Sequence, residues 1–181
     1  MIIDEGSLRV KWYDPEQHLM QLVKLHAECF PQEEWQAKDF RAFINKVGKN
    51  NVLKVLEDEA HRVYGSLLYT LTASTCFIRR VGVLAAFRRK GLATHMVHTL
   101  TGPRSPIRCK TFVAKVRESN YPAVKLFHGR LHFKFDPAAP RPKVETSEVG
   151  AQGEALLEEC YIFAFEKIPV VVDDLLTCKG K

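Results

Sequence analysis

The sequence predicts a single domain of the mixed α/β class. Segments with strand-like alternation and segments with helical periodicity follow one another along the chain, and no internal repeat is evident. The 181 residues suit one compact domain with a sizeable core. An apolar content of 46% with 27% charged residues is ordinary for a folded protein, so the composition argues against a disordered tail protein.

The first expected elements are a strand and two helices. Residues 7–13 alternate apolar and polar side chains, which is typical of a half-buried strand. Asp14 and Pro15 then supply a cap and a first-turn proline for a helix that ends at Cys29-Phe30-Pro31. A second amphipathic helix follows and stops at Gly48. The apolar faces of the two helices contain Leu19, Leu22, Val23 and His26, and then Trp35, Phe40, Phe43, Ile44 and Val47.

The remaining elements are mainly strands separated by two helices. β-Branched and aromatic residues predict the strands, and a cluster of prolines predicts a long loop. In chain order we expect strands over 52–56, 62–71 and 76–83, a helix over 91–100, a strand over 107–116, a helix over 121–131, a loop over 136–152 and a strand over 161–168. Residues 169–181 form a tail that we expect to fray.

Charge and cysteine usage restrict the partners and the compartment. Lysine and arginine number 27 against 21 acidic residues, so the net charge of +6 suits an anionic partner such as nucleic acid, a ribosome or a phosphate-bearing cofactor. The five cysteines form no CxxC pair, which is typical of reduced and buried thiols. No apolar stretch approaches ~18 residues, and the acidic start differs from a signal peptide. We therefore expect a cytoplasmic protein without a membrane segment.

The most informative stretch covers residues 81–94. A strand ends there, the basic loop Arg88-Arg89-Lys90 follows, and a helix begins at Gly91. This order directs free backbone N–H groups and the positive end of a helix at one place, which suits a phosphate or a pyrophosphate. The glycine allows the backbone to approach such a group closely. A solvated surface turn is the alternative, and the stretch is neither a Walker loop nor a GxGxxG dinucleotide motif.

Two motifs resemble those of the GNAT acetyltransferases. Residues 88–93, Arg-Arg-Lys-Gly-Leu-Ala, fit every fixed position of the acetyl-CoA loop of that family, Q/R-x-x-G-x-G/A. Residues 116–127 resemble the second motif of the family, V-R-x-S-N-x-x-A-x-x-L-Y. Upstream, residues 26–31 with Trp35 and Phe40 look like the first helices of the ribosomal-protein-alanine (RimI-type) branch.

The resemblance implies a fold, a domain and a cofactor. It extends over most of the chain up to Ile168, so we place a single GNAT acetyltransferase domain at residues 1–168, with a loop insertion at 136–152. The implied fold is a twisted, mixed and mostly antiparallel sheet that is flanked by helices and split where acetyl-CoA inserts. Acetyl-CoA is the implied co-substrate, and no metal is implied.

The resemblance also assigns cofactor contacts to particular residues. The strand at 81–83 would pair through its backbone with the pantetheine arm, the basic loop and helix start would hold the pyrophosphate, and Asn120 would lie beside the thioester. Ordinary strand packing at 81–83 and a helix N-cap at Asn120 are the structural alternatives. The implied acetyl-CoA contacts are Val81, Gly82, Val83, Arg88, Arg89, Lys90, Gly91, Leu92, Ala93, Thr94 and Asn120.

The acid–base positions of the RimI-type branch carry different residues in this chain. Lys115 stands in place of the family glutamate, and Phe127, which has no hydroxyl, stands in place of the family tyrosine. The Leu-Gly-Phe sequence that usually follows has one inserted residue at 129–133. The general base and the general acid are therefore unassigned. Other candidates have simpler structural explanations and carry no assignment: Glu118, His128 and Tyr161.

The implied function is transfer of an acetyl group from acetyl-CoA to a primary amine, by direct attack in a ternary complex. Without a good base, the acceptor must lose a proton easily. At pH 7, an α-amine with a pKa near 8 costs about 1.4 kcal/mol to deprotonate, whereas a lysine near 10.4 costs about 4.6 kcal/mol. A protein N-terminal α-amine is therefore favoured as the acceptor.

Several alternatives to this function stay open. The acceptor could be the amine of a small molecule, or the chain could be a catalytically weak module that binds acyl-CoA or a partner. Nucleic acid is a minor option, because no RNA-binding signature accompanies the basic charge. Metal binding is not expected, because the histidine pairs at 95 and 98 and at 128 and 132 lack further ligands in the sequence. The acyl-chain preference and the oligomeric state are not predicted.

Overall fold

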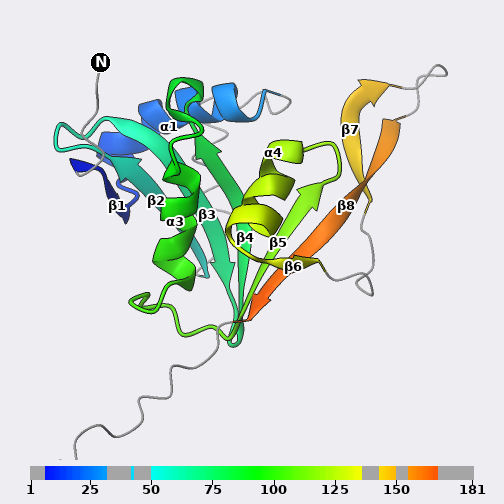
Figure 1. Cartoon of the computed structure of the whole chain (residues 1–181). Coiled ribbons are helices and arrows are strands. Elements are labelled where there is room, and N and C mark those ends of the chain that lie inside the picture. The colour runs from blue at the N-terminus through cyan, green and yellow to red at the C-terminus, as the bar shows by residue number, and fades with distance from the viewer. Residues whose placement is uncertain (1–6, 32–41, 43–49, 136–142, 150–154, 167–181) are drawn as a thin grey trace, which may run out of the picture.

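The fold is a mixed sheet with helices on both faces (Figure 1). The computed structural model describes residues 7–31, 42, 50–135, 143–149 and 155–166. The strands are β1 (Arg9–Trp12), β2 (Asn51–Glu57), β3 (Val63–Leu71), β4 (Thr75–Val83), β5 (Thr111–Arg117), β6 (Lys134–Phe135), β7 (Lys143–Val149) and β8 (Ala155–Glu166). They lie in the order β1-β2-β3-β4-β5-β8-β6, and β7 pairs with the first residues of β8.

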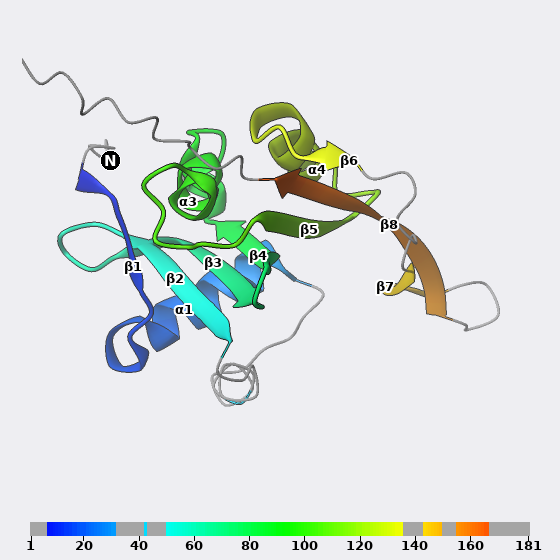
Figure 2. The ribbon, with the colours of Figure 1, turned by 90° about the horizontal axis from the view of Figure 1, so that it is seen from below.

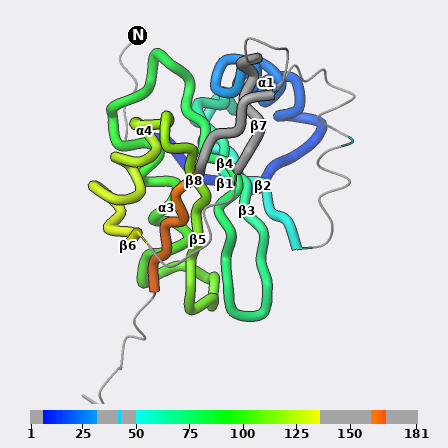
Figure 3. The backbone as a smooth tube through the Cα atoms, turned by 90° about the vertical axis from the view of Figure 1, so that its right-hand side faces the viewer, coloured from blue at the N-terminus to red at the C-terminus, as the bar shows by residue number. Residues whose placement is uncertain are grey.

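The sheet is mostly antiparallel, as the family resemblance implied. The single parallel pair among the described strands is β4 with β5. Helix α1 (Pro15–Cys29) covers one face and contacts β3 and β4. Helices α3 (Leu92–Thr101) and α4 (Tyr121–Val124) cover the other face, together with the π-helical turn η3 (Lys125–Arg130) (Figures 2 and 3). The sheet is therefore the middle of three layers.

Helix α1 forms where its sequence signals predict it. The carboxylate of Asp14 accepts a hydrogen bond of 2.9 Å from the backbone N–H of Glu16, and Pro15 occupies the first turn. The helix ends at Cys29, as expected. Its buried face is built mainly from leucines, and these leucines hold the helix against the sheet: Leu19, Leu22 and Leu25.

The strand predicted over 107–116 is shorter than expected and spans Thr111–Arg117. Two backbone N–H groups at its start donate to the carbonyl of Ser74, the residue just before β4, so the chain joins the sheet only at this point. Ile107 and Cys109 are buried nonetheless, with 9% and 7% exposure. The alternation of buried and exposed side chains at 107–109 therefore belongs to a loop that packs on the core, not to a strand.

The segment predicted as a loop over 136–152 contains a strand, β7, and this part of the loop prediction is wrong. β8 begins at Ala155, before the predicted start at Tyr161, and it extends beyond β5, whose last paired residue faces Cys160. β7 pairs with this overhanging part of β8. The prolines that suggested a loop all precede Lys143, so they end just where the strand begins.

Two predicted segments lie outside the described residues. The second amphipathic helix, up to Gly48, falls there except for residue 42, and so does the tail over 169–181. Among the residues that the structure does describe, no helix has both the length and the apolar composition to cross a membrane.

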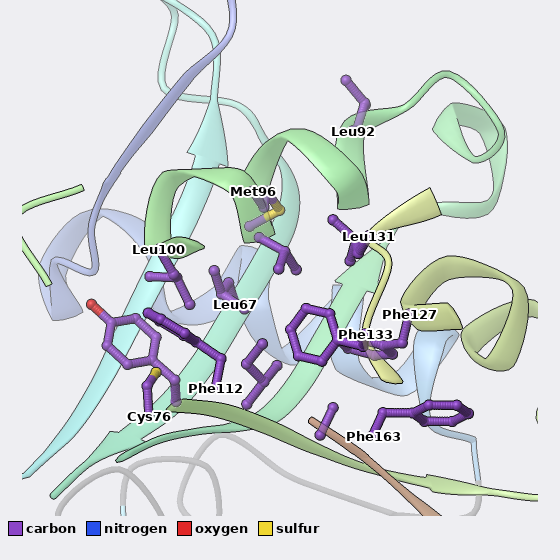
Figure 4. Close-up of a cluster of buried hydrophobic side chains, with 14 of the residues drawn as sticks. Leu67, Cys76, Leu92, Met96, Leu100, Phe112, Phe127, Leu131, Phe133 and Phe163 are labelled. Carbon is purple, nitrogen blue, oxygen red and sulfur yellow. The ribbon is translucent and has the colours of Figure 1, made fainter. Parts of the chain in front are cut away.

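The larger hydrophobic core lies between the sheet and the helices α3 and α4. Met96 and Leu100 of α3 are fully buried and belong to one cluster with Leu67 and Phe112 of the sheet (Figure 4). The ring of Phe127 meets the ring of Phe133 edge to face, with 5.2 Å between the ring centroids. A smaller cluster lies under α1 and contains Leu19, Leu22, Leu25, Leu53, Val55, Val63 and Leu68.

His26 is a buried histidine near the C-terminal end of α1. It is 3% exposed, and its Nε2 lies 3.4 Å from the hydroxyl oxygen of Ser66. Its ring centroid lies 5.2 Å from that of Phe30. Burial, together with the positive charge of Arg80, lowers the pKa of His26 to about 4. The folded protein therefore keeps this imidazole neutral at pH values where the unfolded chain protonates it.

Lowering the pH from 7 to 5 is expected to reduce the free energy of unfolding by about 2 kcal/mol through His26. The pKa of His26 is lowered from 6.5 to about 4 on folding, so the unfolded chain binds more protons between these values. The contribution is present above pH 6.5 and is lost as the pH falls toward 4. Urea unfolding at both pH values measures it, and the His26→Gln variant should lose correspondingly less stability. An equal loss in both proteins would contradict the assignment.

Candidate active site

The sheet opens between its two parallel strands. β4 and β5 pair from Thr75 with Thr111 up to Ile78 with Ala114, and the pairing stops there although both strands continue. A β-bulge lies at this point, because Ile78 and Arg80 face consecutive residues of β3 and leave Arg79 as the extra residue. A bulge bends its strand and increases the local twist. The bulge therefore turns the end of β4 away from β5.

The free end of β4 is backed by helix α1. A side-chain carbon added at Gly82 would lie 3.1 Å from Leu25 Cδ2 and 3.3 Å from Cys29 Sγ, so this glycine faces α1 at close range. Its neighbours Val81 and Val83 pack on the other side, against the core beneath α3. The opening between the strands is therefore walled by α1 on one face and bordered by α3 and α4 on the other.

The loop that follows β4 leads to an uncapped helix N-terminus. Arg89 and Gly91 both adopt left-handed backbone conformations, with φ angles of 65° and 82°. Gly91 is the N-cap residue of α3, and no side chain hydrogen-bonds to the first N–H groups of this helix. A side-chain carbon at Gly91 would meet nothing within 4 Å, so the space in front of the helix is open. Unsatisfied N–H groups and a helix dipole together form an anion site.

The basic side chains of the loop take different directions. The Nε of Arg88 donates to the carbonyl of Val83 at 2.9 Å, and a terminal nitrogen of Arg88 lies 3.7 Å from Cys29 Sγ. The ammonium of Lys90 lies over the ring of Phe87, 5.6 Å from its centroid. Arg88 thus ties the loop to the end of β4 and to α1.

Asn120 follows β5 and starts α4. Its side-chain oxygen accepts a hydrogen bond of 3.2 Å from the backbone N–H of Ala123, so it is the N-cap of this helix. The next residue, Tyr121, is 71% exposed and borders the opening. The cap explains why an asparagine stands at the start of α4, whatever ligand it meets.

One pocket of about 800 Å³ joins these elements. Every residue that the resemblance assigned to acetyl-CoA lines it, except Lys90. The pocket also has lining residues that the sequence did not predict: Cys29, Phe30, Phe87, Tyr121, Pro122, Ala123, Lys125, Leu126 and Arg130. The residues of α4 and η3 lie within the predicted motif at 116–127 or just after it and could have been found from it. Cys29 and Phe30 could not, because nothing in their local sequence links the end of α1 to the opening.

The two positions of the family acid and base differ in their surroundings. Lys115 lies one residue beyond the last parallel pair, with its side chain exposed. Phe127 is buried in the core with 5% exposure and does not line the pocket. His128 is the next residue in the chain, and the Nδ1 atom of His128 lies 3.2 Å from the carbonyl oxygen of Phe133. Tyr161 packs against Phe135, with 5.2 Å between ring centroids. None of these groups is an evident acid or base for the pocket.

Two further observations restrict the chemistry. Burial raises the pKa of the Cys29 thiol, although the hydrogen bond from Arg88 acts in the opposite direction. The protonated thiol lies 3.4 Å from the carbonyl oxygen of Val83 and donates to it. Within the described part of the chain, no group of three or more histidine, cysteine, aspartate or glutamate side chains is placed to hold a metal ion.

The sheet split, the uncapped helix N-terminus and the basic loop together suit an elongated anionic cofactor, and the family match makes this chain an acyltransferase that depends on acetyl-CoA. The chain belongs to the acetyltransferase (GNAT) family, because the sequence model of that family matches residues 19–133. No curated protein sequence matches the chain.

Solved structures with this fold include enzymes with different acceptors. The ribosomal-protein-S18-alanine N-acetyltransferase from Escherichia coli aligns with a TM-score of 0.67 and 15% identity, over 88% of this chain and 94% of that one. NAA60 from Arabidopsis thaliana, in complex with acetyl-CoA, aligns with a TM-score of 0.63 and 17% identity, over 88% of this chain and 98% of that one. A protein provisionally described as a phosphinothricin N-acetyltransferase aligns with a TM-score of 0.66 and 18% identity, over 90% of this chain and 99% of that one. These likenesses establish the fold.

Proposed function

We propose that this N-acetyltransferase acetylates the α-amine at the N-terminus of a protein, by direct attack on acetyl-CoA in a ternary complex. The observation that supports acetyl-CoA as the co-substrate is the course of the pocket. It runs from the start of α3, along the free end of β4, to Cys29 and Phe30 at the end of α1. An elongated cofactor with a phosphate-bearing end fits such a course.

The cofactor residues follow from this placement. The uncapped N–H groups at 92–94 and the open space at Gly91 receive the pyrophosphate. The edge of β4 at 81–83, where it has left β5, pairs with the amide groups of the pantetheine arm as an added strand would. Asn120 lies at the opposite wall, beside the cofactor arm. The thioester then lies near the closed end of the split, where β4 and β5 meet.

The reaction needs few groups from the protein. The neutral amine nitrogen attacks the thioester carbonyl carbon, a C–N bond forms, the C–S bond breaks, and coenzyme A leaves as a thiolate. The amine gives up a proton, and the thiolate takes one up. A covalent acyl-cysteine step is disfavoured at Cys29, because its thiol is protonated and engaged with Val83. Positioning the amine against the thioester supplies most of the rate.

The absence of a base favours an amine that is already partly neutral. Among the described residues that line the pocket there is no carboxylate and no histidine. An acceptor must therefore reach the site without help in losing its proton. At pH 7, the neutral fraction of an α-amine exceeds that of a lysine side chain by roughly 200-fold. An N-terminal α-amine is the protein amine that meets this condition.

Peptides with a free α-amine are therefore expected to be acetylated roughly 200-fold faster than the same peptides with a blocked N-terminus and one lysine. Release of free coenzyme A at pH 7, confirmed by the mass of the product, measures both rates. Raising the pH to 9 should narrow the difference, because the neutral fraction of the lysine then rises about 100-fold and that of the N-terminus only about 10-fold. Equal rates at pH 7, or faster acetylation of lysine, would contradict the proposal.

A module that binds acyl-CoA without efficient turnover is the second candidate. Lys115 and Phe127 favour it, because they stand where related enzymes carry acid–base groups. Calorimetric titration with acetyl-CoA, followed by the release assay with N-terminal peptides and small amines, separates the two. Binding with no release for any amine would support the module and contradict the enzyme.

A further inference from the structure

We propose that the acceptor carries an anionic group, a carboxylate, close to its amine, and that Arg80 and Lys115 recognise this group at the closed end of the split. The inference rests on the proposed function and specifies its substrate class. It excludes polycationic acceptors such as polyamines and lysine-rich N-termini. The carboxylate could belong to an acidic residue at a protein N-terminus or to a free amino acid, and the experiment below distinguishes the two.

Arg80 and Lys115 are placed together by the strand register. Ile78 and Ala114 form the last parallel pair of β4 and β5, and both side chains belong to the core beneath α3. The next residue of β5 is Lys115, and the next residue of β4 after the bulged Arg79 is Arg80. The two cations therefore stand on the two strands at the point where the sheet opens.

Both cations belong to the face of the sheet that α1 covers. The guanidinium of Arg80 lies over the ring of Phe30, 5.4 Å from its centroid, and Phe30 lines the pocket. The neighbours of Lys115 in sequence, Ala114 and Val116, are buried in the core on the opposite face, so strand alternation directs Lys115 to the α1 side. Arg117 follows on the same side by the same alternation. The positive charge of Arg80 also acts on the buried His26 of α1 and contributes to the lowered pKa of that histidine.

The acceptor must approach from this face. The cofactor phosphates belong at the start of α3, on the other face of the sheet, and the cofactor arm occupies the opening along β4. The thioester at the closed end then leaves the α1 side for a second substrate, beyond the part of β4 that α1 covers at Gly82 and near Phe30, which lines the pocket. An acceptor amine that arrives there lies beside the cations of both strands.

The cations act on the acceptor in two ways. They attract a carboxylate near the amine, and two such contacts fix its position relative to the thioester. They also disfavour the ammonium form of the acceptor, since like charges repel, and so increase the neutral fraction that attacks. A second positive charge on the acceptor would add to this repulsion. The site thus selects an amine with an adjacent negative charge and rejects one with an adjacent positive charge.

The test compares acceptors that differ in the charge beside the amine. Three N-terminal peptides carry aspartate, asparagine or lysine at the second and third positions, and two small amines are aspartic acid and its diamide. Because the carboxylates of aspartic acid raise the pKa of its amine, all rates are compared per neutral amine. Release of coenzyme A is measured at pH 7 and low salt, and peptide binding to the protein loaded with coenzyme A is measured by fluorescence anisotropy. We expect the acidic peptide to exceed the lysine peptide at least 10-fold in both assays. Equal values, or a preference for lysine, would overturn the inference.

The Lys115→Glu variant tests the residue itself. The side chain is exposed, so the variant should fold, and the charge reversal should reduce the preference for the acidic peptide at least 10-fold. The affinity for acetyl-CoA should not change. Arg104→Glu makes the same charge change at an exposed position between α3 and β5 and should keep the wild-type preference. An unchanged preference in Lys115→Glu would also overturn the inference.

The outcomes separate the inference from the proposed function. Acidic peptides that bind selectively but release no coenzyme A would support the anionic acceptor site and contradict catalysis. Faster acetylation of aspartic acid than of its diamide, with no peptide acetylated, would support the inference and contradict an N-terminal acceptor. Acetylation of all three peptides at one rate would support the proposed function and overturn the inference.

Discussion

Replacing Gly91 by glutamate is expected to lower the affinity for acetyl-CoA by at least about 100-fold. A residue other than glycine at a φ of 82° strains the backbone by about 1–2 kcal/mol. The carboxylate would also stand in the open space before α3 and repel the cofactor phosphates from the helix N-terminus. The two effects act on the same site and together account for the expected loss.

A graded series separates strain from charge at Gly91. Asparagine tolerates the left-handed conformation and should lower the affinity least, alanine should add the strain without charge, and glutamate should have the largest effect. Calorimetric titration with acetyl-CoA measures the three affinities, and thermal unfolding shows that each variant is folded. If the glutamate variant bound acetyl-CoA as tightly as the wild type, the loop would not be the pyrophosphate site.

Replacing Gly65 by valine is expected to lower the free energy of unfolding by about 3 kcal/mol. A side-chain carbon at this position would lie 2.9 Å from the backbone oxygen of Gly82 and 3.0 Å from Met96 Sδ. The methionine can move, but the backbone oxygen belongs to the neighbouring strand and moves only if the pairing of β3 with β4 is distorted. The free end of β4 would shift with it, so the affinity for acetyl-CoA should fall as well.

Gly129 offers a matched control for this substitution. It lies on η3, where a side-chain carbon would meet nothing within 4 Å and the φ angle is not in the left-handed range. Gly129→Val should therefore change the stability by less than about 0.5 kcal/mol. Chemical unfolding of both variants gives the comparison. Similar stability losses at the two positions would show that the close contact between β3 and β4 is not the cause.

The part of the pocket around the start of α3 was predictable because its residues are continuous in the sequence. The order strand, basic loop, glycine and helix is a local signal, and it places the residues from Val81 to Thr94 around one helix start without any long-range information. Asn120 was predictable for the same reason, since it precedes a proline-containing first helical turn. The ends of helices could be predicted where a capping residue or a turn marks them, as Asp14 does for α1.

The α1 side of the pocket was not predictable, because it depends on contacts between distant segments. Cys29 and Phe30 reach the pocket only because Gly82 lets α1 lie against β4. The carboxylate of Glu28 also accepts a hydrogen bond from the backbone N–H of Ala85, which ties the end of α1 to the loop. The bulge at Arg79 is likewise a property of the β3–β4 pair and has no signature in the sequence of β4 alone.

The inserted residue after Phe127 has a structural explanation. The turn from Lys125 to Arg130 is π-helical, and the N–H of Leu131 donates to the carbonyl of Leu126 at 3.0 Å, five residues earlier. A π-helical turn takes up one more residue than an α-helical turn. The extra residue is thus absorbed within the helix, and Leu131 and Phe133 still reach the core.

The split between β4 and β5 also gives the protein two sheet edges in its interior. An unpaired strand edge is a template for strands of other chains and a common start of aggregation. Here α1 lies against one side of the free end of β4, and α3 and α4 border the other. Helices on both sides of an unpaired edge are one of the ways in which proteins protect such edges. The same arrangement suits a ligand of one strand's width, which pairs with the edge between the helices.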